Sequence, residues 1–352
     1  MNRRLRPLKY LSAFSLPVSV SIAFIWQGYW SFFPLAYVFG VIPIVELLIS
    51  PSTSNLTKTE EALVQKDLLY DWLLYLSVPI QYILLFYFFT IVQSDLTGYE
   101  LVGCTLSMGL MCGGFGINIA HELGHRSKPF DKLMAKILLL TSLYMHFYIE
   151  HNRGHHKHVA TEKDPASARY GEALYVFWFR SVIFGYLSAW QLEHKKLRQN
   201  GKSSFSLSNQ MLLFQLIQMI FVITVGIIWG LKAVCCFIGA AVIGFLLLET
   251  VNYIEHYGLN RKATTNGRYE RVQPHHSWNS NHLIGRLLLF ELSRHSDHHY
   301  IASRKYPILR HHENSPQMPT GYPGMMLLAL LPPIWFGVMH PKIRTLNKAT
   351  EY

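Results

Sequence analysis

The residues of this chain best suited to chemistry are histidines, which gather in four clusters. Neutral imidazole ligates iron, zinc and copper. Three clusters contain two histidines four residues apart, and we expect a helix to direct each such pair to one point. Nine imidazoles are too many for one ion and suit two. They are His121, His125, His151, His155, His156, His256, His295, His298 and His299.

The spacing also suggests how the clusters are used. We expect His156 and His298 to project further round their helices than the paired histidines, as if one helix served two metals. Ligating imidazoles usually donate their second nitrogen to a carboxylate or carbonyl. The candidate partners are Glu122, Glu150, Asp164, Asn252, Glu255 and Asp297, with Glu46 as a further option.

A zinc protease is the first alternative, because His121-Glu122-x-x-His125 matches the zincin signature. The further histidines overfill such a site, which keeps a position open for water. The other nine of the eighteen histidines are interpreted as surface or hydrogen-bonded residues. His275, His276 and His282 are the ambiguous members of that set.

Composition places these histidines in a membrane protein. Half of the 352 residues are hydrophobic and only 15% are charged, against about a quarter in soluble proteins. Each apolar block approaches the ~20 residues that cross a bilayer as a helix. Two further blocks, 137–149 and 323–340, are interpreted as interfacial or surface-lying. The predicted spans are 10–28, 31–50, 70–92, 98–120, 208–229 and 233–255.

Charge orients these six spans. Of the 32 Lys and Arg residues, 31 fall on the side of both termini, and the other side keeps only Lys232. Basic residues accumulate in cytoplasmic loops. The metal-binding segments 121–207 and 256–352 are therefore predicted to be cytoplasmic, as are both termini. The net charge of +11 is assigned to the membrane surface and an acidic protein partner, not to nucleic acid.

The sequence around the histidines resembles one family. His121-Glu-Leu-Gly-His-Arg, Glu150-His-Asn-Arg-Gly-His-His, Asn252-Tyr-Ile-Glu-His-Tyr-Gly and Leu292-Ser-Arg-His-Ser-Asp-His-His299 are similar to the motifs of membrane-bound non-haem diiron alkane 1-monooxygenases. The likeness continues through Pro274-His-His-Ser-Trp-Asn-Ser-Asn281 and Pro319-Thr-Gly-Tyr-Pro323 and covers nearly the whole chain. Ser293 departs from the family, where many members have Gln.

The resemblance implies an all-α integral membrane protein of six transmembrane helices with a cytoplasmic histidine-rich diiron cap. It would form one hydroxylase domain over residues 1–352 of a bacterial inner-membrane protein. The implied reaction converts a medium- or long-chain n-alkane, O2 and two electrons to a primary alcohol and water. The nine clustered histidines would ligate two non-haem iron ions.

Selection of the alkane terminus must be steric, because an alkane has no polar handle. Val38 and Phe39 on the second span are candidate walls of an apolar channel, with ordinary helix packing as the alternative. About 1–3 kcal/mol of discrimination per methylene predicts that a range of chain lengths is accepted.

Electrons must come from another protein. Some relatives carry a fused rubredoxin, whose iron needs paired Cys-x-x-Cys motifs. The four cysteines here, Cys104, Cys112, Cys235 and Cys236, lie within predicted spans and lack that pattern. We therefore expect a separate rubredoxin and its NADH-dependent reductase.

Two other functions compete with alkane hydroxylation. The first is another membrane diiron oxidase, either a methyl-aromatic hydroxylase or a fatty-acyl desaturase or hydroxylase. The second is a divalent-metal transporter with a cytoplasmic histidine sensor, which would require ionisable residues in the middle of spans. The segment around His256 favours the alkane and xylene hydroxylases among these.

Overall fold

The structure, a computed structural model, describes residues 3–349, and within them every regular element is helical. A 3-10 segment, Arg3–Phe14, precedes the first α-helix, and shorter 3-10 and π-helical segments lie between later ones. Strand-like pairing among the described residues is limited to isolated bridges. The α-helices are α1 (Ser15–Trp26), α2 (Phe33–Ala36), α3 (Ile42–Leu48), α4 (Lys58–Val64), α5 (Leu69–Ile91), α6 (Gly98–Leu110), α7 (Asn118–Gly124), α8 (Pro129–Leu140), α9 (Phe147–Glu150), α10 (His156–His158), α11 (Leu174–Gln199), α12 (Gln210–His256), α13 (Leu283–Leu288), α14 (His295–Tyr300), α15 (Tyr322–Ala329) and α16 (Pro332–Ala349).

Several helical stretches are long and apolar enough to cross a membrane. Within the described residues there are five, or six if the bent pair α15–α16 counts as one. The first four, Arg6–Trp26, Gly28–Leu48, Leu69–Ile91 and Gly98–Gly124, match the first four predicted spans within a few residues. The chain is therefore a membrane protein, as its composition predicted.

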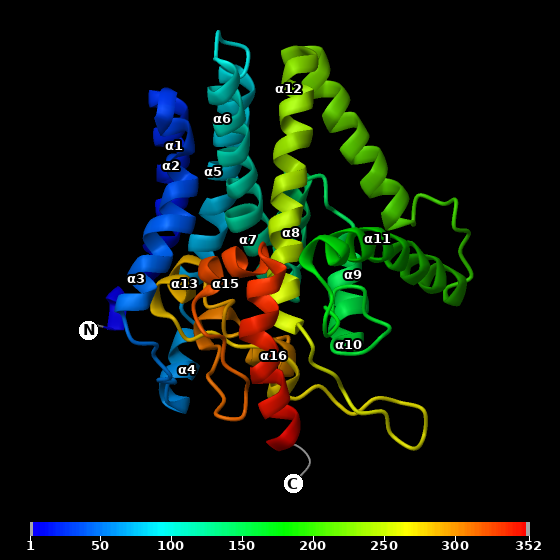
Figure 1. Ribbon diagram of the computed structural model, residues 1–352. Coiled ribbons are helices and arrows are strands. Elements are labelled where there is room, and N and C mark those ends of the chain that lie inside the picture. Colours follow the sequence, from blue (N-terminus) through cyan, green and yellow to red (C-terminus); the bar gives the residue numbers. More distant parts are fainter. Residues whose placement is uncertain (1–2, 350–352) are drawn as a thin grey trace. The chain divides into compact units, whose positions relative to one another are not determined.

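The fifth stretch, α12, contains both remaining predicted spans. Its 47 residues would extend about 70 Å as one straight helix, more than twice the ~30 Å hydrocarbon core. At Gly230 the backbone leaves the helical region, with φ 76° and ψ 178°. Figure 1 shows the ribbon of α12 folding back there into two limbs. Glycine suits this bend because a side chain disfavours positive φ.

Close packing fixes the helix that carries the first histidines. A π-helical segment, Met111–Ile117, joins α6 to α7. A Cβ atom on Gly113 would lie 2.6 Å from the carbonyl oxygen of Gly244 on α12, and one on Gly109 would lie 2.6 Å from Ile243. Small residues let membrane helices approach this closely. The contact holds α7 at a defined position along α12.

The segment 323–340 is more buried than its proline-interrupted sequence predicted. Helices α15 and α16 meet at an angle of 119°. Tyr322, Met325, Trp335 and Met339 are buried along one side, so only the other side of this segment is at the surface. The stretch 137–149 is not among the candidate spans: α8 ends at Leu140, and the chain turns before α9.

The described chain divides into two compact units. One contains the residues up to Gly40, Asp67–Gly154 and Tyr186–Leu248. The other contains Val41–Lys66, His155–Gly185 and the residues from Glu249 onward. The histidine clusters are thereby divided, with His121, His125 and His151 in the first unit and the other six in the second.

Candidate metal centre

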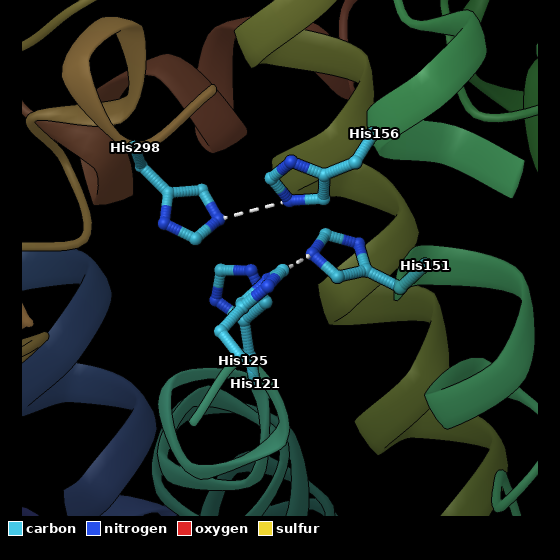
Figure 2. A group of neighbouring side chains, drawn as sticks. All are labelled: His121, His125, His151, His156 and His298. Atoms are coloured by element: carbon cyan, nitrogen blue, oxygen red, sulfur yellow. Dashed lines mark hydrogen bonds between the residues drawn. The ribbon is translucent and has the colours of Figure 1, made fainter. Parts of the chain in front are cut away.

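Three imidazoles of the first unit converge. His121 lies on α7, His125 follows its last turn, and His151 begins the π-helical segment His151–His155. Their ring centroids are 4.3 to 5.0 Å apart, and the Nε2 atoms of His125 and His151 are 3.0 Å apart. Figure 2 shows these three rings pointing toward one another. We refer to them as the trio.

Aromatic and ionic contacts hold the trio in place. The Phe147 ring stacks on His151 at 4.6 Å. Directly after His125, the buried Arg126 guanidinium donates to Asp71 Oδ1 at 2.5 Å and to Glu122 Oε1 at 3.0 Å. The attraction of these carboxylates outweighs burial and raises the pKa of Arg126 above its ordinary value. The cation therefore ties the end of α7 to α5.

Four imidazoles of the second unit form a second group, the quartet. His155 Nε2 is 3.2 Å from His299 Nε2, and His256 Nε2 is 3.1 Å from His295 Nε2. One ring nitrogen from each of the four lies within 4.8 Å of those of the others, and all four residues are buried. Convergent imidazole nitrogens are suited to a metal ion.

One ring of the quartet, His299, is held in the protonation state that binds metal. Burial, together with neighbouring imidazoles, holds the pKa of His299 well below its usual range. A neutral ring offers a lone pair, whereas a protonated one does not. Two more histidines of this unit, His156 and His298, face each other with Nε2 atoms 3.1 Å apart, as Figure 2 shows.

One predicted pairing of histidines is wrong. His295 and His299 do converge, but His151 and His155 contribute to different groups. Four residues advance a helix by about 6 Å, so two rings on one face can serve neighbouring points instead of one. The segment between them is also π-helical, which i,i+4 spacing in the sequence did not reveal.

Two predicted partner carboxylates lie against ligand-type imidazoles. Asp164 Oδ2 is 2.8 Å from His155 Nδ1, and it also accepts from the Ser167 hydroxyl at 2.6 Å. Burial raises the pKa of Asp164, but His155 and these hydrogen bonds outweigh it and lower the pKa overall. Glu255 Oε2 is 3.1 Å from His295 Nε2.

The remaining predicted partners make hydrogen bonds with other groups. Glu122 binds Arg126, Glu150 accepts from Ser188, and Asn252 donates to Glu249. Asp297 accepts from His312, Arg304 and the backbone N–H of Arg310. Glu46 accepts from the Gly285 backbone N–H at 2.8 Å. These contacts fix the helices and loops around the imidazoles.

The ambiguous histidines are poorly arranged to ligate metal. His275 and His276 lie near Glu270, close enough for three donors to meet an ion. However, His276 Nδ1 accepts from the Gln273 backbone N–H at 2.9 Å. Because burial lowers the pKa of His276 to about 4, the neutral ring must then carry its proton on Nε2. That N–H points to Glu270 Oε1 at 3.3 Å, and His282 Nδ1 is 3.0 Å from the Ser280 hydroxyl.

Two site residues were not predicted from the sequence. The Tyr322 hydroxyl donates to Glu255 Oε1 at 2.6 Å, and both side chains are buried. The Trp278 backbone N–H donates to the Glu255 carbonyl at 2.8 Å, and its indole N–H donates to the Tyr257 carbonyl at 3.0 Å. Both residues belong to motifs quoted above, but nothing in their spacing indicated a contact with the end of α12.

The candidate channel residues are half-buried in a π-helical segment, Tyr37–Val41. Neither Val38 nor Phe39 lines the cavity of about 330 Å³ beside α12. That cavity lies within the first unit, bordered by Leu143, Gln215, Gln218, Met219, Val222 and Ile223.

The chain is similar to several known proteins whose names describe monooxygenases. Residues 99–329 match the family described as fatty acid desaturase. Alkane 1-monooxygenase 2 of Alcanivorax borkumensis is 40% identical over 321 residues, covering 90% of this chain and 84% of the relative. Alkane 1-monooxygenase 2 of Pseudomonas aeruginosa is 39% identical, covering 92% and 86%. The xylene/toluene monooxygenase hydroxylase component XylM of Pseudomonas putida is 27% identical, covering 70% and 65%.

Proposed function

This chain belongs to the alkane 1-monooxygenases, within the wider fatty acid desaturase family, and from that premise we propose that it hydroxylates the terminal carbon of n-alkanes. One oxygen atom of O2 enters the alcohol, and two electrons and two protons reduce the other to water. The observation that carries the proposal is the convergence of buried, ligand-type imidazoles in a chain about 40% identical to enzymes of that name.

We assign the metal as two non-haem iron ions. We propose that the quartet supplies imidazole nitrogens to one ion and the trio to the other, with His156 and His298 as the two further ligands that the motifs predict. All-nitrogen donor sets suit iron. When bound, the irons supply the redox chemistry with O2, whereas the protein sets ligation and orients the substrate.

The chain's own residues keep the site in its binding-competent form. Asp164 holds the His155 ring by its Nδ1–H, which directs the Nε2 lone pair inward. Glu255 differs from Asp164, because its Oε2 lies 3.1 Å from His295 Nε2, the nitrogen that also faces His256, so it adjoins the metal point itself. Its position is fixed by the Tyr322 hydroxyl. Burial of the quartet excludes bulk water from the point at which its nitrogens meet.

We further propose a topology of six crossings, with α12 crossing twice, in the bacterial inner membrane. Both termini and the histidine clusters would be cytoplasmic, in accord with the distribution of basic residues. The two compact units would then act as one hydroxylase domain, because the nine ligands are drawn from both. Accessibility of a cysteine at exposed Thr265, labelled in inside-out but not right-side-out vesicles, tests this orientation.

The electron donor is proposed to be a separate rubredoxin with its NADH-dependent reductase. The excess of basic residues favours an acidic carrier. Turnover with reduced rubredoxin should therefore fall as ionic strength rises. A rate that does not change between low and high salt would remove electrostatic docking from the proposal.

A methyl-aromatic hydroxylase is the second candidate, because XylM is also a relative. Its identity to this chain is 27%, against 37–40% for the alkane enzymes. The purified protein, reconstituted with rubredoxin, reductase and NADH, should be offered n-alkanes, xylene and acyl substrates in parallel. We expect primary alcohols from alkanes, whereas preferential oxidation of xylene would support the second candidate.

A further inference from the structure

One long helix, α11, has an exposed apolar face although it is not one of the helices that could cross a membrane. Helix α11 exposes Val176, Phe179, Ile183 and Leu187, which recur every three or four residues along one side. Phe179 is 73% exposed and the neighbouring Phe184 56%. Helix α11 is not among the candidate membrane spans, and it ends in basic residues.

The opposite face of α11 is packed against the protein. Phe177, Ser181, Ala189 and Leu197 are buried, and the Trp178 indole N–H donates to Thr250 at 3.1 Å. Rotating the helix to bury its apolar face would break these contacts. The apolar face therefore needs an apolar environment from outside the chain.

The loop that follows α11 continues the same pattern. Phe205 and Leu207 are 91% and 95% exposed, and Lys202 is exposed beside them. Lys195 and Arg198 are exposed on the last turns of α11. Apolar side chains accompanied by basic ones are typical of segments that lie in the interface of a bilayer with anionic headgroups.

The helix that follows this loop indicates that lipid lies close to the exposed apolar residues. Helix α12 starts at Gln210, and its first limb exposes apolar side chains at Leu213, Leu216, Ile220 and Ile223. These side chains belong to a candidate membrane span and therefore face lipid. The exposed apolar residues of the loop thus lie within a few residues of a lipid-facing surface.

We propose that α11 and the loop 200–208, together called the interfacial segment, bind the surface of an anionic bilayer. The apolar face of α11, Phe205 and Leu207 enter the boundary between headgroups and acyl chains. Lys195, Arg198 and Lys202 contact the anionic headgroups.

The interfacial segment also holds the residues that precede the quartet. Arg153 donates to Glu193 Oε2 of α11 at 2.6 Å, and the Ser188 hydroxyl donates to Glu150 at 3.4 Å. A Cβ on Gly154 would lie 3.2 Å from Leu192 Cδ1, so the Leu192 side chain of α11 packs directly on the Gly154 backbone. Binding of α11 to the bilayer surface would therefore fix the depth, relative to the membrane, of the π-helical segment that begins at His151. This consequence rests on the proposed function only in treating His151 as a ligand.

The test measures the depth of nitroxide labels in the full-length protein in nanodiscs. Labels are placed at Phe179→Cys or Leu187→Cys in a Cys235→Ser background, because Cys235 is the exposed one of the four cysteines. Thr265→Cys in an exposed loop is the water control, and Ile220→Cys is the hydrocarbon control. Relaxation by O2 is compared with relaxation by a water-soluble nickel chelate.

We expect the ratio of O2 to nickel accessibility at Phe179 and Leu187 to exceed that at Thr265 several-fold. Adding phosphatidylglycerol to phosphatidylcholine should deepen both labels, and Lys195→Glu with Arg198→Glu should abolish this shift. Ratios equal to the Thr265 control would overturn the proposal. So would labels inaccessible to both reagents with spin–spin broadening, since a second copy would then cover this face.

A second readout follows the link to the histidines. Phe179→Asp with Phe184→Asp should accelerate amide hydrogen exchange over residues 147–158 in nanodiscs. The reason is that α11, which contacts this segment, would no longer be held at the bilayer surface. Unchanged exchange would contradict the positioning role. Neither measurement requires turnover. A protein that fails to hydroxylate alkanes could therefore still show membrane binding by the interfacial segment, and an active enzyme could still lack it.

Discussion

Substitution of Asp164 provides the sharpest test of how the quartet is built. The carboxylate is fully buried, and its Oδ2 lies 2.8 Å from His155 Nδ1. It also accepts from the Ser167 hydroxyl at 2.6 Å and the Ala166 backbone N–H at 3.1 Å. Three hydrogen bonds fix its position, so its charge polarises the His155 ring and strengthens Nε2 as a donor.

The expected magnitude follows from what each substitution removes. Loss of such an outer partner typically weakens metal binding about 10- to 100-fold. Asp164→Asn retains an oxygen that can accept from Nδ1–H but loses the charge, so we expect about tenfold, or about 1.4 kcal/mol. Asp164→Ala removes the acceptor as well, and we expect about 100-fold, or about 2.7 kcal/mol.

The assay is iron content after equilibration with graded concentrations of an iron chelator. Both variants should lose one iron per chain at lower chelator than the parent protein, while the second iron is retained. Asp131→Asn is the matched control, because Asp131 is equally buried but accepts from the Tyr75 hydroxyl, away from the quartet's own helices. Identical release curves for the parent and Asp164→Ala would refute the assignment of Asp164 to a ligand of the quartet.

Three further predictions concern stability and the length of the substrate. Arg126→Met should destabilise the protein by about 3–5 kcal/mol, measured as a lower unfolding temperature in detergent, because two buried carboxylates lose their cation; an unchanged temperature would contradict this. Gly321→Ala should also lower that temperature, since a Cβ would overlap the buried Glu46 carboxylate, and Glu46→Ala should relieve the defect. Val38→Trp should shorten the preferred alkane, and an unchanged chain-length profile would remove Val38 from the channel.

The sequence predicted the helical membrane class and four of the spans closely, because apolar blocks of span length reflect the thickness of the bilayer. It also identified the histidines that meet in the quartet. It left open how the nine histidines divide between two groups. The separation of His151 from His155 depends on a π-helical turn, whose backbone leaves no mark in residue spacing.

Contacts between residues far apart in the chain were equally hidden from the sequence. Tyr322 reaches Glu255 across 67 residues of sequence, and motif spacing carries no information on such a distance. Of the predicted carboxylate partners, Asp164 does not adjoin a histidine cluster in sequence, yet it lies against His155. Asp297 directly precedes His298, but its position on α14 directs it to Arg304 instead.

We propose above that a two-iron site held by these histidines oxidises the end of an alkane. The most direct measurement supplies the purified, iron-loaded protein with rubredoxin, its reductase, NADH, n-octane and ¹⁸O2, and identifies the product by mass spectrometry. We expect 1-octanol with one ¹⁸O atom from protein that contains two irons per chain. Unlabelled or secondary alcohol, or full activity from protein with a single iron, would contradict it.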